Sequence, residues 1–523
     1  MSDIVAAPAK ARFRLTHVAR SSLLIGILFG VDKALGLLRQ VLIGRQFGVS
    51  AELDAFNAAN NLPDLLFALI SGGALAIAFI PVLSETMERR GREAAWALFS
   101  RVANLAFLIT GVAAVIIAVF AGPLVRAELG IAPGFNPERQ ALVANLMRLN
   151  LVATLIFSIS GLVIAGLQAN QHFLLPALAP AIYDLGQIFG AVFLAPSQGY
   201  RLAGIQLPAA GLGIYGLVYG VILGAALHLV VQIPGLIRYR FRWAPRLGLD
   251  DPGVRKVATL MGPRILTIGA FQLIFVIQDN LASRLDVGSV TALVYGWLIM
   301  QVPETVIGTA VGTALLPTLS EHFARGDETA FEASAARAIR LLLALTLPVA
   351  VLMMGVLRPL VQTVFGFDAR GTDLVVWAAR AYLVGLVGHA LLEVVARAFY
   401  ARQNARTPMV AALFGAVLFT VLGIALFGPL HANGIALSNS LAFTAQALLL
   451  LTLLARGFPE TVHIGRTLLR AALAAALGGG TAYGLLLALA GSSPLLAGLA
   501  ASLAGGLVIV PFIWPELREL GRL

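Results

Sequence analysis

The stretch that decides the fold is VDKALGLLRQVLIGRQFGVSAELDAFNAANNLPDLLFALISGGALAIAFIPVLSE, residues 31–85. It predicts two apolar helices, separated by a short loop at Gly48 and each long enough to cross a hydrocarbon core of about 30 Å. Asp32, Lys33 and Arg39 lie inside the first helix. An ion at a bilayer centre costs about 2.5 to 3.5 kcal/mol on insertion scales, so such residues usually face a wet cavity or a partner. The stretch therefore predicts a membrane protein with a polar chamber.

Composition extends this prediction to the whole chain. Of 523 residues, 59% are hydrophobic and 12% are charged, and the mean hydropathy is +0.89. No water-soluble domain of this size carries so much apolar surface. We predict an all-α polytopic membrane protein with about 14 transmembrane helices. The expected spans are 22–45, 55–84, 102–123, 145–167, 173–195, 210–235, 257–281, 287–318, 339–358, 375–400, 408–427, 432–455, 468–490 and 494–515.

The net charge of +11 indicates orientation rather than a nucleic-acid partner. With the N-terminus inside, roughly 24 basic residues fall on the inner side and roughly 9 on the outer side, which predicts that both termini are cytoplasmic. The chain has no cysteine, which excludes disulfides and cysteine-based metal sites. The histidines show no metal-ligand spacing, and every loop is short. We expect no catalytic residue, metal or cofactor, and no enzyme activity.

An internal repeat predicts two similar lobes. The segment Phe79–Glu85 (FIPVLSE) returns 236 residues later as Leu315–Glu321 (LLPTLSE), and Gln171 is echoed by Gln403 at an offset of 232. Either offset covers six expected helices, an even number, so the copies point the same way and the substrate path lies between them. The predicted division is a tail (1–20), an N-lobe (21–240), a C-lobe (241–460) and two further helices with a tail (461–523).

The first helix offers candidates for substrate binding. Arg39 and Lys33 could present positive charge to an anionic substrate, since arginine suits bidentate phosphate contacts. Asp32 precedes Arg39 by seven positions and shares nearly the same helix face. The alternative is an ion pair with a carboxylate on another helix.

The second helix carries Asn57, Asn60, Asn61 and Asp64 around Pro63. Asn57 and Asn61 are further candidates for substrate binding. A proline loosens a helix, which predicts hinges for alternating access; hydrogen bonding that merely joins helices is the alternative. The predicted hinge positions in the two lobes are Pro63, Gly73, Pro81, Pro303, Gly312 and Pro317.

Three further features remain inside the expected spans. Asp279 could bind a coupling ion, a proton or sodium, or could pair with Arg284 or Arg264. Glu393 and Arg397, four residues apart, predict a local salt bridge. The small residues Gly216, Gly220 and Gly224 predict close helix packing.

Taken in order, these motifs resemble the MurJ (MviN) family of the multidrug/oligosaccharidyl-lipid/polysaccharide exporter superfamily. In the first half the resembling pieces are Gly36-x-x-Arg39, Phe47-Gly48, Asp54-Ala55-Phe56, Leu62-Pro63-Asp64-Leu65-Leu66, Gly73-Ala74 and Ala78-Phe79-Ile80-Pro81. In the second half they are Ala282-Ser283, Gly288-Ser289-Val290, Tyr295, Pro303, Gly308-x-Ala310-x-Gly312-Thr313-Ala314-Leu315-Leu316-Pro317 and Leu319-Ser320.

The resemblance implies a V-shaped bundle in the bacterial cytoplasmic (inner) membrane. Such a bundle would move lipid II, the undecaprenyl-diphosphate-linked peptidoglycan precursor, from the inner to the outer leaflet by alternating access. The headgroup would lie in a cationic cavity and the tail in a lipid-facing groove. The implied partners are lipid II, membrane lipids and a coupling ion, and the expected state is a monomer.

The sequence departs from the family pattern in the cavity. Phe67 stands where members typically have arginine, and Tyr295-Gly296-Trp297-Leu298 replaces Tyr-Ala-Asp-Arg. Of the cavity arginines, Arg39 is matched, and Lys33 takes the place of another basic residue. Three alternatives therefore stay open: export of another lipid-linked sugar, drug/cation antiport, and a non-transporting scaffold for cell-wall enzymes.

Overall fold

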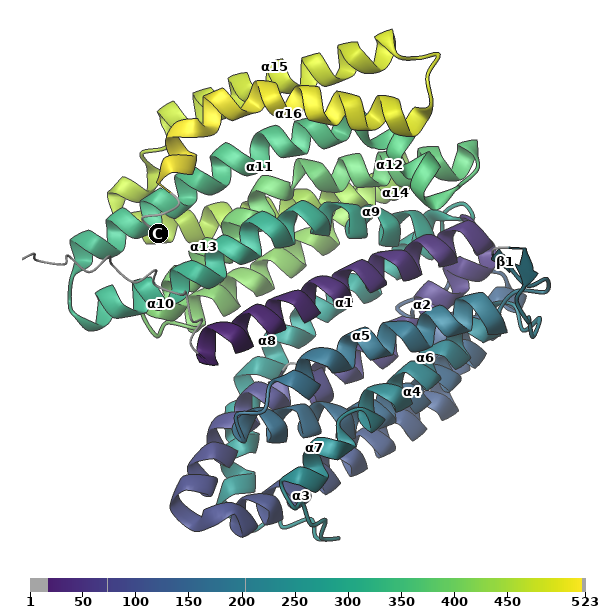
Figure 1. The fold of residues 1–523 in the computed structure, drawn as a ribbon, viewed down its shortest axis with the longest axis vertical. Helices are drawn as coiled ribbons and strands as arrows, with labels where there is room; N and C mark the ends of the chain where they lie inside the picture. The colour runs from purple at the N-terminus through teal and green to yellow at the C-terminus, as the bar shows by residue number, and fades with distance from the viewer. Residues whose placement is uncertain (1–16, 73, 203, 520–523) are drawn as a thin grey trace, which may run out of the picture.

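Helices build almost all of the computed structural model, which describes residues 17–72, 74–202 and 204–519 (Figure 1). The first half contains α1 (His17–Phe47), α2 (Ala51–Leu66), the π-helical turn η1 (Phe67–Gly72), α3 (Ala74–Arg126), α4 (Pro137–Ala169), α5 (Leu174–Phe189), the π turn η2 (Gly190–Leu194), strands β1 (Arg201–Leu202) and β2 (Ile205–Gln206), α6 (Ile214–Val230) and α7 (Ile233–Arg238). The two strands pair antiparallel, with Arg201 opposite Gln206.

The second half continues without strands in the described residues. It contains α8 (Pro252–Ser283), α9 (Ser289–Pro303), the π turn η3 (Glu304–Thr309), α10 (Ala310–Ala324), α11 (Glu328–Phe365), α12 (Ala369–Val384), α13 (Leu386–Ala401), α14 (Arg406–Ala455), the 3-10 turn η4 (Pro459–Val462), α15 (Gly465–Ala488) and α16 (Pro494–Arg518).

Each predicted span falls on a helix or on consecutive helical pieces of the described chain. Two long helices contain sharp turns, α3 at Gly91 (φ 81°, ψ 174°) and α14 at His431 (φ 54°, ψ −138°). Each of these helices therefore supplies two of the predicted spans. Only glycine readily adopts the backbone angles of Gly91, which is why the chain can reverse there without a longer loop.

Length and composition agree with a multi-pass membrane protein. Among the described residues, nine helical runs are long and apolar enough to cross a membrane, with α3 and α14 each counted once. The pair α12 and α13, bent by 43° at Gly385, makes a tenth. The remaining predicted spans fall on α1, on α8 and on the additional arms of α3 and α14. The prediction of an all-α polytopic fold is confirmed.

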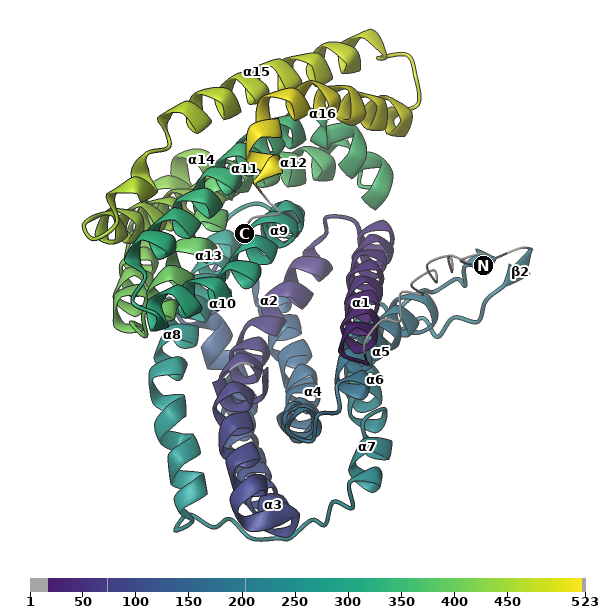
Figure 2. The ribbon, with the colours of Figure 1, turned by 60° about the vertical axis from the view of Figure 1, so that its left-hand side comes forward.

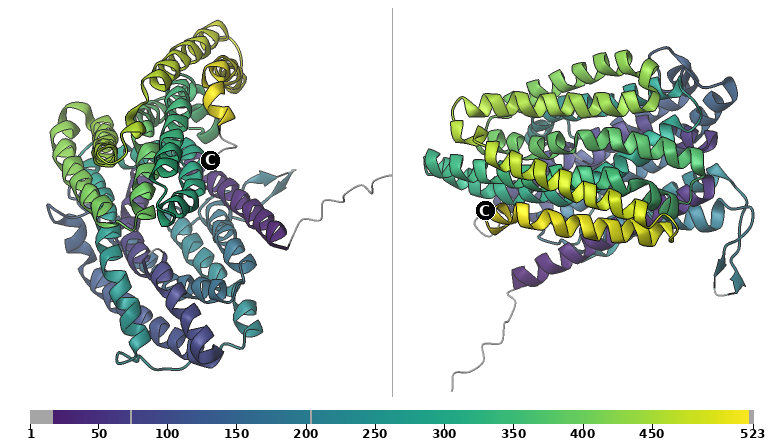
Figure 3. Two further views of the ribbon diagram at one scale, coloured as in Figure 1. Left: turned by 90° about the vertical axis from the view of Figure 1, so that its left-hand side faces the viewer. Right: turned by 90° about the horizontal axis from the view of Figure 1, so that it is seen from above.

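The helices gather in two groups (Figures 1 and 2). Helices α2 to α7 pack with one another, and α9 to α14 form the second group. Helix α1 packs on α5, and α8 lies between α3 and α14 and contacts both. Helices α15 and α16 pair with each other and cover α11 on the outside (Figure 3). The domain boundaries at residues 20, 240 and 460 stay a prediction.

The repeat reappears as backbone geometry. Gln171 and Gln403 both have positive φ, 59° and 57°. Next to them, His172 N donates to Leu167 O (2.9 Å) and Asn404 N donates to Phe399 O (3.0 Å), the same helix-ending turn at the same offset of 232. The π turns η1 and η3 also interrupt the two helices that carry the repeated FIPVLSE and LLPTLSE motifs.

Glycines bring α5 and α6 into backbone contact, as the sequence predicts. A Cβ at Gly220 would lie 2.8 Å from the Cα of Gly190, and a Cβ at Gly190 would lie 2.6 Å from the Cα of Gly220. Gly216 and Gly224 are equally crowded by the backbone of α5 and η2. Without these glycines the two helices could not approach so closely.

Candidate functional site

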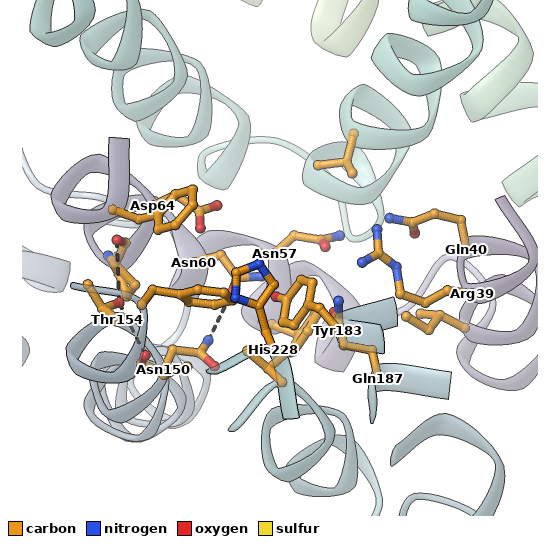
Figure 4. Close-up of a pocket in the computed structure, with 18 of the residues that line it drawn as sticks. Arg39, Gln40, Asn57, Asn60, Asp64, Asn150, Thr154, Tyr183, Gln187 and His228 are labelled. Atoms are coloured by element: carbon orange, nitrogen blue, oxygen red, sulfur yellow. Dashed lines mark hydrogen bonds between the residues drawn. The ribbon is translucent and has the colours of Figure 1, made fainter. Parts of the chain in front are cut away.

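A cavity of about 510 Å³ opens in the first group of helices (Figure 4). Its wall comes from α1, α2, α4, α5 and α6, and Val294 and Tyr295 of α9 close one side. The polar residues that line it are Arg39, Gln40, Asn57, Asn60, Asp64, Asn150, Thr154, Tyr183, Gln187 and His228. Of the three ions of the first helix that predict a polar chamber, only Arg39 lines this cavity.

Arg39 lines this cavity and is paired with a carboxylate. Its Nη1 lies 2.7 Å from Oδ1 of Asp184 on α5, and the two side chains are 20% and 8% exposed. The structure therefore contains the alternative that the sequence analysis gave for Arg39, an ion pair with a carboxylate on another helix. The Nε of Arg39 is buried and has no hydrogen-bond partner among the described residues. The guanidinium thus keeps a donor free at the cavity wall.

Asp64 is the second charged group at the cavity, and its carboxylate forms no hydrogen bond or ion pair with a described residue. Its side chain is exposed to the cavity space. Next to it, Asn150 Nδ2 donates to Asn60 Oδ1 (2.6 Å). Phe67 lines the wall and meets the Phe157 ring edge-on at 5.0 Å.

Polar residues on one face of α2 join the two groups of helices. Asp54 accepts hydrogen bonds from the backbone of Gly288 (2.6 Å) and Thr291 (2.8 Å), and from the Thr291 hydroxyl (2.7 Å). It therefore caps the start of α9, whose own N-cap is a glycine. Asn57 donates to the same hydroxyl (3.3 Å), and Asn61 donates to Asp279 on α8. We call Asp54, Asn57 and Asn61 the α2 stripe.

Lys33 and Asp32 lie away from the cavity. They pair with each other at 3.3 Å, and the Lys33 side chain is 62% exposed. Asp32 lines a separate hollow of about 250 Å³ beside Phe29. Their predicted role in substrate binding is untested and stays a prediction.

Asp279 is buried between the two groups, and its hydrogen-bond partner there is a neutral amide rather than a cation. It is 4% exposed and accepts from Asn61. Arg284, one suggested partner, instead pairs with Glu128 at 2.8 Å; the side chain of Arg264, the other, lies outside the described residues. The predicted salt bridge between Glu393 and Arg397 is present, at 2.9 Å.

Two of the predicted hinge positions, Pro63 and Pro303, lie just before a π turn. Pro63 comes four residues before η1, and Pro303 directly precedes η3. Gly312 faces Arg397 so closely that a Cβ there would overlap the guanidinium. Gly73 lies outside the described residues. Hinge motion at all six positions stays a prediction.

Asp184, Tyr183, Gln187 and His228 were not singled out from the sequence. Asp184 could have been, because a carboxylate in a predicted span needs a partner. His228 gives no such signal; its Nδ1 lies 2.6 Å from Oγ of Ser160, so a side chain of α4 holds the ring of this α6 residue. No group of three or more potential metal ligands occurs in the described part of the chain.

Comparison with known proteins agrees with this arrangement. The family model described as "Lipid II flippase MurJ" matches residues 43–493. A curated relative from Burkholderia cenocepacia, named lipid II flippase MurJ, is 33% identical over 433 residues, 80% of each chain. The chain belongs to the MurJ family.

Solved structures show the same fold. A MurJ flippase in an inward closed conformation superposes with a TM-score of 0.77 at 23% identity, over 95% of this chain and 99% of that one. An inward-facing multidrug transporter of the MATE family gives 0.66 at 15% identity, over 83% and 95%. Membership of the MurJ family identifies the protein as a transporter rather than an enzyme.

Proposed function

We propose that this protein is a flippase that moves lipid II from the inner to the outer leaflet of the bacterial inner membrane, with both termini in the cytoplasm. The observation that carries the proposal is the match to the MurJ family over residues 43–493. The cavity beside Arg39 supports it, because arginine binds diphosphate oxygens with short charge-assisted hydrogen bonds.

Arg39 would exchange partners when the substrate enters. In the described state its Nη1 is held by Asp184 and its Nε is unsatisfied. A diphosphate group would supply acceptors for both. Because Asp184 holds the guanidinium in place without substrate, the cation does not remain unpaired in the membrane between cycles.

The α2 stripe would be the contact that opens toward the outside. The positive-inside bias of the sequence predicts that the start of α2 and the start of α9 lie at the outer face. Asp54 and Asn57 tie these two helix ends together. Release of a headgroup to the outer leaflet requires this contact to part.

A coupling ion would act at Asp279. Its carboxylate is buried and accepts a hydrogen bond from Asn61 of the α2 stripe. A proton or sodium ion bound there would compete with Asn61 and weaken the contact between α2 and α8. We propose proton or sodium coupling at this position, in a protein that works as a monomer.

Depletion and replacement test the function. A bacterial strain depleted of its own lipid II flippase is supplied with this chain, and the leaflet that holds tagged lipid II is determined. We expect growth to be rescued and the precursor to reach the outer leaflet. Precursor that stays in the inner leaflet, with the protein present in the membrane at normal amounts, would exclude the proposal.

A further inference from the structure

A second cavity, of about 570 Å³, lies in the second group of helices, between α8, α9, η3, α13 and both arms of α14. One water molecule takes about 30 Å³ of liquid volume. The space is therefore much larger than a bare ion needs, and the proposed diphosphate site at Arg39 does not use it.

Glu304 gives this cavity an uncompensated negative charge. The charged residues that line it are Glu304, Glu393 and Arg397, two carboxylates and one guanidinium. Arg397 already pairs with Glu393 at 2.9 Å. Among the described residues, the Glu304 carboxylate accepts only from the hydroxyls of Thr305 and Thr309, each at 3.4 Å. These distances are long for hydroxyl donors, so this carboxylate lacks a strong partner.

The π turn η3 holds these groups in one polar strip. Thr309 donates its hydroxyl to Glu304, and its carbonyl accepts from Arg397 Nη1 (3.4 Å). Gly312, one turn on, leaves the space that the guanidinium fills. Arg397 is thus held beside Glu393 and Thr309, and a single guanidinium serves the two carboxylates of the cavity.

Aromatic rings form another part of the cavity wall. The ring of His389 stacks on Phe443 with centroids 4.3 Å apart and meets Trp297 edge-on at 5.3 Å. Phe271 lies 6.0 Å from Phe443, and Tyr400 lines the same space. Aromatic faces next to a carboxylate are the combination that binds ammonium groups, through cation–π attraction.

Gln446 supplies an independent sign of a ligand. Its side chain is 7% exposed and lines the cavity. It forms no hydrogen bond with a described residue, and its Oε1 rests against Gly415 on the other arm of α14. Amides that are nearly buried are normally hydrogen-bonded, so the Gln446 amide at the cavity wall is available to a polar ligand.

We propose that this cavity binds an organic ammonium group, with Glu304 as its counter-ion and Trp297, His389 and Phe443 around it. The ammonium group has two sources: an amino group on the peptide of the transported lipid, which rests on the proposed function, or a free lipophilic amine.

Binding of a simple amine tests the proposal without any variant. Isothermal titration of the full-length protein in nanodiscs with hexylammonium is compared with its neutral analogue 1-hexanol, and empty nanodiscs give the background. We expect saturable binding of hexylammonium, at least about tenfold tighter than hexanol, as loss of a charge-assisted contact predicts. Equal binding of the two probes would overturn the proposal.

Two matched variants locate the site. Glu304→Gln should remove the preference for the cation, whereas Asp64→Asn, which neutralises the unpaired carboxylate of the other cavity, should keep it. A second variant, Trp297→Leu, serves if Glu304→Gln does not fold. It should weaken the binding of hexylammonium more than the binding of hexanol. The reverse pattern would contradict the proposal, as would sodium binding that depends on Glu304 without any hexylammonium binding.

Two lipid II samples separate the sources. If the peptide amine is the ligand, N-acetylation of that amine weakens lipid II binding to the wild type but not to Glu304→Gln. If a free amine is the ligand, acetylation has no effect and hexylammonium still binds. A protein that binds hexylammonium but no lipid II would refute the proposed function and leave the ammonium site standing.

Discussion

At the residue scale, the cavity depends on how Arg39 is paired. The bond to Asp184 spans 145 positions of sequence, and local spacing gives no information about such a partner. An arginine in a predicted span indicates that some partner or cavity exists. Arg39 has both a partner and a cavity. Its Nη1 donates to the carboxylate of Asp184, and its Nε has no acceptor among the described residues.

Substitutions at the pair separate substrate binding from simple bridging. Asp184→Asn removes the carboxylate that competes for Arg39, so a lipid diphosphate should bind several-fold more tightly. Arg39→Ala should weaken the binding of the lipid diphosphate at least about tenfold, since a hydrogen bond to a charged group contributes about 1.5–3 kcal/mol. Equilibrium binding of lipid II to both purified variants checks this. Equal weakening in both variants would mean that the pair only bridges α1 and α5.

Gly312 should be essential for space rather than for flexibility. Gly312→Ala places a methyl group on the Arg397 guanidinium and should destabilise the protein by about 1–3 kcal/mol, the usual cost of overpacking. Gly355→Ala on α11, where a Cβ would meet nothing within 4 Å, is the matched control. Thermal unfolding of both variants measures the effect. A double variant with Arg397→Ala should recover most of the loss, because the two positions are in direct contact.

At the element scale, helix content and order could be predicted from apolar length and basic flanks, but helix interruptions could not. Prolines 63 and 303 indicate loosening, yet the π turns that follow them depend on packing against neighbouring helices. The sharp turns at Gly91 and His431 replace loops that the sequence predicted. The structure explains why a glycine stands at position 91, since the backbone angles there suit glycine alone. It offers no similar reason for His431.

The turn at Gly91 should depend on the backbone alone. A Cβ at Gly91 would contact nothing within 4 Å, so Gly91→Ala tests strain without a clash. We expect a loss of about 1–3 kcal/mol. Gly480→Ala in the middle of α15, also free of contacts, should instead stabilise by about 0.5–1 kcal/mol. Thermal unfolding in one detergent compares the two, and a neutral Gly91→Ala would show that the turn relaxes.

At the scale of the whole molecule, the repeat could be predicted because two short motifs recur at a nearly constant offset. The contact that joins the two groups of helices could not be predicted. Asp54 caps a helix that begins more than 230 residues later. From the neighbouring sequence, Asp54 looks only like an acidic residue in the first turn of its own helix. The asparagines of α2 indicated hydrogen bonding between helices; which helices they join became clear only from the fold.

Transport by a crosslinked protein tests most directly whether the α2 stripe must open. The chain has no cysteine, so Asn57→Cys with Thr291→Cys gives a single pair across the stripe. A second pair, Thr467→Cys with Glu516→Cys, joins α15 to α16, whose side chains meet at 3.1 Å, and serves as the control.

We expect the oxidised stripe pair to stop lipid II movement in proteoliposomes and a reductant to restore it, while the control pair transports in both states. Undiminished transport with the stripe pair fully crosslinked would show that the two groups of helices need not separate there.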